Sequence, residues 1–274
     1  MSLSRRGFLG SAALLGLGGV ACADLGAWTR ERNHRRVDAA EAKYGRAVAV
    51  AGCGFLDCPA FALDDRFRPP QSPYCPQPGD LVFSITKSVI GRIGHAVSGA
   101  GEPSHSGYVF RRPDGSLAVM EAGPYDIPVI ESRDLAGHLP AYHARGHVWV
   151  RPRCAPLTPD QDCRLTEVSA KQEGKPFARL RVYRQVTPFK ARGPHRTEAL
   201  GGPHGPDRRA YYCAELAAEA FVYAGLVPAE DARPSATYPS DLFYDESRDR
   251  FLDEHFRLSR FGWGVPSRWR PQMI

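Results

Sequence analysis

The chain has 274 residues, of which 43% are hydrophobic and 24% charged, with 27 Gly, 24 Pro and 7 Cys. This composition excludes a disordered chain, which has few apolar residues, and a small disulfide scaffold, in which Cys is far denser. The formal net charge of +6 is too small to argue for a nucleic-acid partner. The sequence also lacks a glycine-rich phosphate loop, a dinucleotide fingerprint and the aromatic–basic interleaving that nucleic acid requires.

The N-terminus has the pattern of an export signal. Arg5 and Arg6 precede an apolar, Gly-rich run over residues 8–20, which ends in Ala21-Cys22-Ala23. The run is shorter than the ~20 apolar residues of a membrane span, so it predicts a twin-arginine signal peptide over residues 1–23. We therefore expect a bacterial protein that uses the twin-arginine export machinery and is periplasmic or otherwise extracytoplasmic. It would be cleaved after Ala23 or anchored by a lipid on Cys22.

Residues 24–78 read as an N-terminal extension with two parts. The spacing of apolar residues predicts an amphipathic helix over 24–52. Residues 53–78 combine three Cys with six Pro, which favours an ordered but irregular segment or a linker.

From residue 79 onward, strands and helices follow one another in mixed order, which predicts one α+β domain over 79–274. The expected strands are 79–83, a hairpin of 107–110 and 117–120 around a turn at 113–115, and 147–151. The expected helices are 89–97, 159 to about 174, and 211–224. Residues 188–209 are poor in apolar residues and rich in Gly, Pro, Arg and His, which predicts a surface loop.

Cys213 lies in the first turn of the predicted helix 211–224. Free N–H groups and the helix dipole stabilise a thiolate at such a position, and can bring a cysteine pKa from ~8.5 to between ~3.5 and ~7.5. Position alone leaves two interpretations open, an activated nucleophile and a buried core cysteine.

A cysteine nucleophile needs a base, and the base needs an orienting group. His105 begins the first strand of the predicted hairpin, and Glu121 ends the second. With the turn at 113–115, the numbers of facing residues sum to about 226 to 228, so His105 and Glu121 are opposite or diagonal on one face. The alternative is a surface histidine beside a surface glutamate.

Two other groups of residues have the types that bind metals. His138, His143 and His147 are suitably spaced, but Pro140 and the following strand interrupt a shared helix face, and no acidic residue accompanies them. Cys53, Cys58 and Cys75 lack a matched fourth ligand. We therefore expect no metal and no cofactor.

If Cys213 is reserved for catalysis, five cysteines remain in an exported chain, and at most two disulfides can form. The five are Cys53, Cys58, Cys75, Cys154 and Cys163. Their pairing stays open; the nearest pairs by sequence are Cys53–Cys58 and Cys154–Cys163, which would leave Cys75 as a free thiol.

Five short motifs follow one another between residue 79 and about residue 227. They are Gly79-Asp80-Leu81-Val82-Phe83, Ser104-His105-Ser106-Gly107-Tyr108-Val109, Val119-Met120-Glu121-Ala122, Gly174-Lys175-Pro176-Phe177 and Tyr212-Cys213-Ala214-Glu215-Leu216. In this order they resemble the permuted papain-fold hydrolases of the YiiX/YebB-like, NlpC-related type, in which the histidine precedes the cysteine. The resemblance implies a circularly permuted papain-like domain whose antiparallel sheet packs against helices, preceded by an N-terminal helical extension.

The resemblance also implies roles for individual residues. Cys213 would be the nucleophile, His105 its general base and then acid, and Glu121 the group that orients the imidazole. The backbone N–H of Cys213 would contribute to an oxyanion site. Tyr212 and Asp80 are secondary candidates for substrate binding.

The implied activity is that of a cysteine amidase or peptidase, which cleaves an amide or ester through a Cys thioester. The expected substrate is a peptidoglycan peptide or an N-acylated amino acid. Two alternatives stay open, a lipid acyltransferase or deacylase on the same fold and a non-catalytic envelope-binding protein. The chain departs from the family at Ala214, where Ser is common, in its long basic stretch before Tyr211 and in its extra segment 24–78; these departures concern substrate preference.

Overall fold

The computed structural model describes residues 31, 34–36, 38–39, 41–42, 53–57, 71–85, 89–124, 127–185, 187–202, 204 and 208–272. The chain divides into two compact units, residues 1–39 and 40–274. The described residues between 31 and 42 are helical, as the sequence predicts, and Arg35 pairs with Glu31 one turn away at 3.4 Å. The expected signal peptide 1–23, with Cys22, lies outside the described residues.

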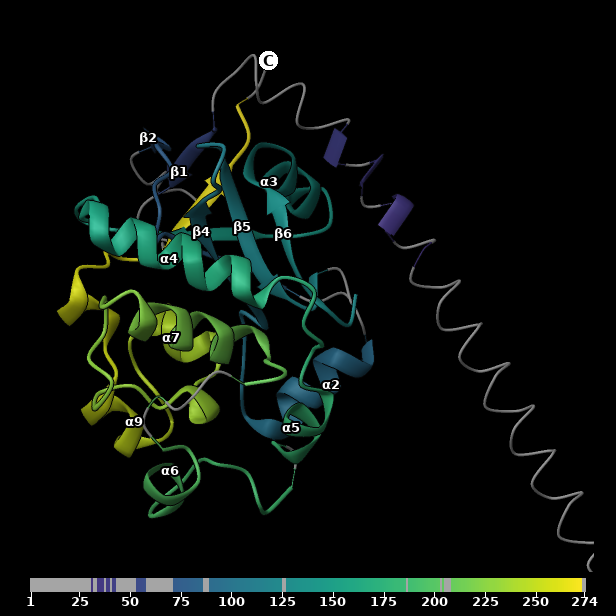
Figure 1. Ribbon diagram of the computed structural model, residues 1–274. Helices are drawn as coiled ribbons and strands as arrows, with labels where there is room; N and C mark the ends of the chain where they lie inside the picture. The colour runs from purple at the N-terminus through teal and green to yellow at the C-terminus, as the bar shows by residue number, and fades with distance from the viewer. Residues whose placement is uncertain are drawn as a thin grey trace, which may run out of the picture. The chain divides into compact units, whose positions relative to one another are not determined.

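In the second unit, the described residues form an antiparallel sheet of eight strands, which confirms the α+β class (Figure 1). The order across the sheet is β2-β1-β8-β7-β3-β4-β5-β6. The strands are β1 (Phe55–Asp57), β2 (Gln71–Pro73), β3 (Leu81–Ser84), β4 (His105–Arg111), β5 (Leu117–Ala122), β6 (Ile130–Asp134), β7 (Val148–Arg151) and β8 (Ser267–Arg270).

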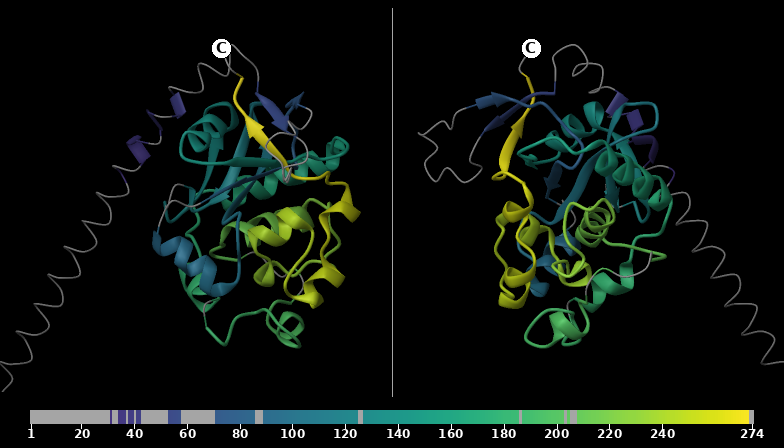
Figure 2. Two further views of the ribbon diagram at one scale, coloured as in Figure 1. Left: turned by 180° about the vertical axis from the view of Figure 1, so that it is seen from behind. Right: turned by 60° about the vertical axis from the view of Figure 1, so that its left-hand side comes forward.

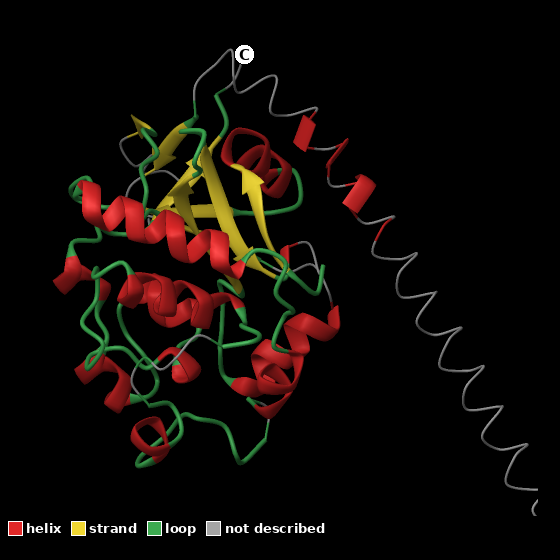
Figure 3. Cartoon of the chain, in the orientation of Figure 1, coloured by secondary structure: helices red, strands yellow, loops and turns green. Residues whose placement is uncertain are grey.

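Helices pack around this sheet (Figure 3). They are α2 (Val89–Ser98), α3 (Leu135–His143), α4 (Pro159–Gln172), α5 (Arg179–Arg184), α6 (Arg196–Ala199), α7 (Cys213–Tyr223), α8 (Pro239–Tyr244) and α9 (Arg250–His255), with the 3₁₀ turns η2 (Pro234–Ala236) and η3 (Leu258–Phe261). The hairpin and the helices expected near 89, 159 and 211 are confirmed. Helix α4 begins where the sequence places it, because Thr158 and Gln161 form a capping box. None of the described helices is long and apolar enough to cross a membrane.

The two faces of the sheet carry different residues, because successive side chains of a strand point to opposite sides. On one face, Tyr108 and Met120 belong to an apolar core that α4 and α7 complete. The rings of Tyr108 and Phe221 meet edge to face, with their centroids 5.7 Å apart. Full burial of an aromatic side chain of this size contributes roughly 1.5–3 kcal/mol, so this core holds α7 firmly against β4. The other face carries Glu121 and is covered by α3.

The expectation of an irregular segment over 53–78 is wrong for residues 55–57 and 71–73. These residues form β1 and β2, and β1 pairs with both β2 and the C-terminal strand β8. Figure 2 shows the yellow β8 beside the dark blue β1. Pro73 is compatible with this arrangement because β2 is the edge strand, where a missing N–H costs no bond of the ladder. The partner of β1 is more than 200 residues away in the chain, so local sequence patterns carry no sign of the pairing.

Cys53, Cys75, Cys154, Cys163 and Cys213 are free thiols, while Cys58 lies outside the described residues. No bond joins Cys154 and Cys163 in the structure, and their pairing stays a prediction. The backbone N–H of Cys154 bonds to the carbonyl of Gly262 at 2.9 Å, so this residue is attached to the C-terminal segment, while Cys163 is exposed on α4.

Candidate active site

The β4–β5 hairpin brings His105 and Glu121 to one face of the sheet. Its register pairs Gly107 with Glu121, so Glu121 lies diagonally across from His105. Nε2 of His105 is 3.4 Å from Oε1 of Glu121, and both side chains are largely buried. The diagonal arrangement was one of the two that the turn position predicts, and the structure confirms it.

Gly107 makes room for the Glu121 carboxylate. A Cβ atom at Gly107 would lie 2.5 Å from Cγ of Glu121 and 2.9 Å from the carbonyl oxygen of Met120. Any side chain at this position would displace Glu121 from β4. The glycine two residues after His105 thus has a steric function in the site.

Cys213 begins α7 at the end of the sheet where β4 starts, and it is 8% exposed. Its thiol is within hydrogen-bonding reach of the His105 imidazole and of the backbone N–H groups of Ser106 and Ala214. Because Nε2 of His105 faces Glu121, Nδ1 is the ring nitrogen left for the sulfur. The structure therefore places the imidazole between the thiol and the carboxylate.

The electrostatics of these groups favour a charged pair. Burial alone would raise the pKa of Cys213, but the hydrogen bond and charge of His105 and the two backbone N–H groups outweigh it, so this pKa is lowered. Burial alone would lower the pKa of His105, but the charge of Glu121 and the hydrogen bonds with Cys213 and Glu121 raise it to about 10. Both shifts favour a thiolate beside an imidazolium over the neutral thiol and imidazole.

Helix α3 supplies two further partners of Glu121. Nε2 of His138 is 3.1 Å from Oε2 of Glu121, and the hydroxyl of Tyr142 donates a hydrogen bond to the same oxygen at 2.8 Å. One carboxylate oxygen thus faces His105 and the other faces α3. Burial would raise the pKa of Glu121, yet the charges of His138 and His105 hold it well below its usual range.

Glu41 holds His138 from its other side. Oε1 of Glu41 is 2.8 Å from Nδ1 of His138, and Oε2 is 3.8 Å from Nη1 of Arg133. Burial would lower the pKa of His138, but the charge of Glu121 and its hydrogen bonds with Glu121 and Glu41 raise it to about 9. Acidic and basic groups therefore alternate from the Cys213 thiol through His105, Glu121 and His138 to Glu41. Each charged group has a neighbour of opposite charge.

The sequence patterns did not predict the role of His138, Tyr142 and Glu41. Pro140 and the following strand were expected to interrupt a helix face shared by His138, His143 and His147, whereas α3 runs through Pro140 and is capped by Asp134, whose carboxylate accepts a hydrogen bond from the N–H of Gly137. Burial of most of the helix offsets the backbone bond that proline removes. The spacing of His138 and Tyr142 by four residues was an available signal, because such residues share one face of a helix.

The other histidines of that group lie apart from the site. His143 packs its ring edge to face with Trp269, with 5.6 Å between centroids, and His147 contacts Arg268. In the part of the chain that the structure describes, no group of three or more His, Cys, Asp or Glu has an arrangement that could hold a metal ion.

The two secondary candidates for substrate binding have structural partners instead. The hydroxyl of Tyr212, a buried residue, donates to the carbonyls of Pro234 and Thr237. Asp80 is fully buried and accepts hydrogen bonds from the hydroxyl of Tyr74 and the backbone N–H groups of Gln77 and Arg153. Their role in substrate binding stays a prediction.

No protein-family model and no curated protein matches the sequence. Among solved structures, the chain is similar to the metalloprotein yiiX of Escherichia coli O157:H7, a DUF1105 protein, with a TM-score of 0.38 and 19% sequence identity. The likeness covers 58% of this chain and 69% of that chain. At this TM-score the likeness establishes no common fold.

Proposed function

We propose that this protein is an exported cysteine hydrolase that cleaves an amide or ester through an acyl-thioester on Cys213. The observation that carries the proposal is the His105 ring, which lies between the Cys213 thiol and the Glu121 carboxylate. A nucleophile, a base and an orienting carboxylate in this order form the arrangement that activates a cysteine.

In the proposed reaction, the Cys213 thiolate attacks the substrate carbonyl carbon and forms a tetrahedral intermediate. The backbone N–H of Cys213 lies in the first turn of α7, where helix N–H groups lack partners within the helix, and would donate to the new oxyanion. Imidazolium His105 gives its proton to the leaving amine or alcohol, and the acyl group stays on sulfur. Neutral His105 then takes a proton from water, the hydroxide attacks the thioester, and the carboxylic acid and the thiolate–imidazolium pair are released.

We propose further that the fold is a permuted papain-like domain. Two features support this: the helix that begins with Cys213 packs against the antiparallel sheet that bears His105, and the chain order is His105, Glu121, Cys213. Export rests on the N-terminal pattern of residues 1–23. The proposed substrates are a peptidoglycan peptide or an N-acylated amino acid, and the reaction as written needs no cofactor and no metal.

One observation favours a second candidate, a lipid acyltransferase or deacylase. Two apolar side chains of α5, Leu180 and Tyr183, are exposed, while Arg181 of the same helix bonds to Glu215 in the first turn of α7. An apolar surface this close to the nucleophile would suit an acyl chain.

Alkylation of Cys213 tests the proposed chemistry, with exposed Cys154 and Cys163 as internal controls. Mass spectrometry of each cysteine after iodoacetamide treatment should show Cys213 reacting at a pH where the control thiols do not, because its thiolate persists at lower pH. His105→Ala should shift the Cys213 profile to higher pH and leave the controls unchanged. Identical profiles for all three thiols, in both proteins, would refute an activated Cys213.

Acyl capture tests the substrate class. Incubation with a muropeptide, an N-acyl amino acid or a phospholipid should add the acyl mass to the Cys213 peptide, and Cys213→Ser should abolish turnover. Transfer of the acyl group to an added amine or alcohol in preference to water would favour the acyltransferase. Saturable murein binding that survives Cys213→Ser, without acylation of the wild type by any of the three donors, would identify a binding protein instead.

A further inference from the structure

Large apolar side chains are exposed on two helices and the loop that follows the second. Ile93 and Val97 of α2 are 59% and 65% exposed, Leu180 and Tyr183 of α5 are 85% and 65% exposed, and Phe189 is 74% exposed. We call these five residues the α2–α5 patch. Single exposed apolar residues are ordinary, but a group of large ones indicates a docking surface.

The parts of the α2–α5 patch lie side by side. Helices α2 and α5 are neighbours in Figure 1 and in the view from behind in Figure 2. Nζ of Lys190, next to Phe189, is 3.5 Å from the carbonyl oxygen of Ser98 at the end of α2. One continuous surface therefore includes both helices and the loop.

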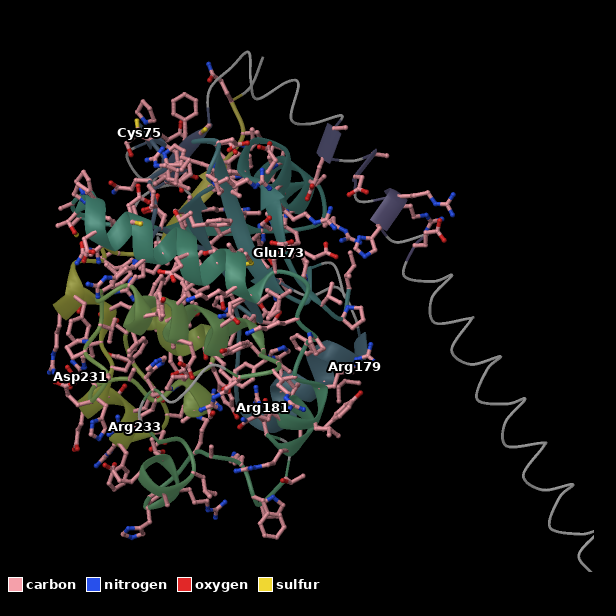
Figure 4. All side chains as sticks on the ribbon, in the orientation of Figure 1. Cys75, Glu173, Arg179, Arg181, Asp231 and Arg233 are labelled. Atoms are coloured by element: carbon pink, nitrogen blue, oxygen red, sulfur yellow. The ribbon has the colours of Figure 1, made fainter. Side chains whose placement is uncertain are left out.

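The segment that contains α5 and the loop after it is rich in cations. Residues 174–197 contain seven Lys or Arg and no Asp or Glu, and the next acid, Glu198, pairs with Arg233 and His255. Two of them, Arg181 and Arg192, pair with buried carboxylates of α7 and α8. Figure 4 shows Arg179 at the outer side of α5 and Arg181 turned toward α7.

Four cations at the α2–α5 patch have no carboxylate partner among the described residues. They are Arg179, Arg184, Lys190 and Arg196. Arg184, Lys190 and Arg196 reach only backbone carbonyls, those of Phe189, Ser98 and Pro188. These cations are therefore available to an external anion while their apolar neighbours face the same solvent.

The α2–α5 patch borders the candidate active site. His95 of α2 is close enough to His105 for the charge of His105, after burial, to lower its pKa. Arg181 of α5 bonds to the carbonyl of Ala210 and to Glu215, on either side of Cys213. A partner on this surface would thus lie next to the nucleophile.

We propose that the α2–α5 patch binds the surface of an anionic phospholipid bilayer. Aliphatic and aromatic side chains interleaved with Arg and Lys are the composition of interfacial membrane-binding segments, in which the apolar groups enter the headgroup region and the cations meet lipid phosphates. At a protein–protein interface, polar and charged groups of both partners usually form directed pairs at the rim around the apolar core. Here Arg179, Arg184, Lys190 and Arg196 have no carboxylate partner among the described residues and share a segment with Leu180, Tyr183 and Phe189, which fits a diffuse anionic surface better. This proposal does not depend on the chemistry of Cys213.

Vesicle flotation of the full chain tests the proposal. The protein should float with phosphatidylcholine vesicles that contain phosphatidylglycerol, and should bind pure phosphatidylcholine at least tenfold more weakly, because each cation near an anionic surface is worth about fivefold in affinity. The apolar run 8–20 is present in every variant compared, so differences between variants report the patch alone.

Matched substitutions separate the patch from general surface effects. Val97→Glu should lower vesicle affinity about tenfold, whereas Val265→Glu, at a valine 55% exposed elsewhere on the surface, should leave it unchanged. Arg184→Gln should lower affinity about fivefold, and Arg260→Gln, at an exposed arginine of η3, should have no effect.

Three results would overturn the proposal. One is equal binding by all four variants, and another is equal binding to neutral and anionic vesicles. The third is concentration-dependent self-association that Val97→Glu abolishes while vesicle binding persists, since the surface would then bind a second copy of the chain.

A second inference comes from the β1–β2 register. Phe55 pairs with Pro73, and the N–H of Tyr74 bonds to the carbonyl of Gly54 at 2.8 Å, so Cys53 and Cys75 flank this last bond, just beyond the paired residues of β1 and β2 (Cys75 is labelled in Figure 4). Burial raises the pKa of Cys53, and the charge of Cys75 raises it further, which is consistent with two thiols at the same end of the ladder. In an antiparallel ladder, a pair next to a hydrogen-bonded pair has its Cα atoms ~4.5 Å apart, within the range that a disulfide needs.

We infer that Cys53 and Cys75 form a disulfide when the protein meets a disulfide oxidant. The Cys53 or Cys75 thiolate attacks glutathione disulfide and releases one glutathione thiolate; the second cysteine then displaces the other glutathione, so two protein thiols are oxidised and one glutathione disulfide is reduced. The bond would join the edge strand β2 to β1 and hence to β8.

Peptide mapping of the full chain after incubation with glutathione disulfide tests this inference. Trypsin should leave residues 47–66, with Cys53 and Cys58, joined to residues 67–87, with Cys75. The link should survive Cys58→Ser and disappear in Cys53→Ser. A link that survives Cys53→Ser, a bond within residues 47–66, or complete alkylation of Cys53 and Cys75 would overturn it.

Discussion

Two carboxylates, Glu121 and Glu215, lie on the two sides of the candidate nucleophile and differ in the cations that hold them. Both are at most 1% exposed. Glu121 is paired with two histidines, His105 and His138. Glu215 is paired with two arginines, Arg181 and Arg208, and also accepts a hydrogen bond from Ser235.

The type of cation paired with each carboxylate determines what that carboxylate can do. Arginine keeps its charge at any ordinary pH, so the Glu215 group is a permanent structural contact that attaches α5 to the start of α7. Histidine can gain or lose a proton, so the Glu121 group can support proton transfer at His105 while it keeps the ring oriented. Burial is similar in the two places, and the type of cation separates a reactive site from a structural one.

The largest expected effect comes from Glu121→Gln, which removes the charge and keeps the shape. The pKa of His105 should fall, the thiolate–imidazolium pair should weaken, and turnover should drop by about 10²–10⁴-fold. A pH series of Cys213 alkylation measures the change directly, and the reaction should begin at a higher pH than in the wild type. If the profile does not move, Glu121 does not act through His105.

Glu215→Gln tests the structural role of the second carboxylate. It should lower the free energy of unfolding by about 1–3 kcal/mol, because Arg181 and Arg208 lose a buried partner but are partly exposed and can turn to water. The alkylation profile of Cys213 should stay within about threefold of the wild type. Urea denaturation measures the first effect. A large shift of the profile with unchanged stability would contradict the structural role.

The pH dependence of stability should also distinguish the two carboxylates. The folded pKa values of His105 and His138, about 10 and about 9, exceed the unfolded value of ~6.5. Their contribution is therefore complete below pH ~6.5 and is lost as the pH rises through 9 to 10. Glu121 has a folded pKa below its unfolded value of ~4.3, so its contribution is present above pH ~4.3 and is lost on acidification.

Between about pH 6 and pH 10, the wild type should consequently lose more stability than Glu121→Gln, in which the histidines have no buried carboxylate at this position. Glu215→Gln should lose as much as the wild type over the same interval. Urea denaturation at both pH values measures the differences. Parallel losses in all three proteins would mean that the histidine pairs contribute nothing to stability.

The smallest expected effect is that of Ser106→Ala. The Ser106 hydroxyl is buried and has no hydrogen-bond partner among the described residues, while its backbone N–H is within hydrogen-bonding reach of the Cys213 sulfur. Alanine keeps the N–H, so alkylation of Cys213 should be unchanged, and the free energy of unfolding should change by less than about 1 kcal/mol. A strong loss of reactivity would show that the hydroxyl itself takes part.

Features that depend on short-range interactions could be predicted from the amino-acid sequence. The α+β class, the β4–β5 hairpin with His105 and Glu121 on one face, and a helix with Cys213 in its first turn all follow from the turn at 113–115, from alternation along strands and from helix periodicity. These signals are local, because a turn sets a hairpin register and a helix repeats its pattern within a few residues. Three of the candidate site residues could therefore be named in advance.

The side chains that complete the site and the strands that complete the sheet depend on tertiary packing between segments far apart in the chain. His138 and Tyr142 reach Glu121 because α3 covers the face opposite α7, and Glu41 reaches His138 from 97 residues away. Likewise β1 pairs with β8 at the far end of the chain and with β2, which brings Cys53 and Cys75 to the same end of that ladder. Such contacts depend on how separate elements pack, and a packing partner leaves no periodic signal in the segment that it meets.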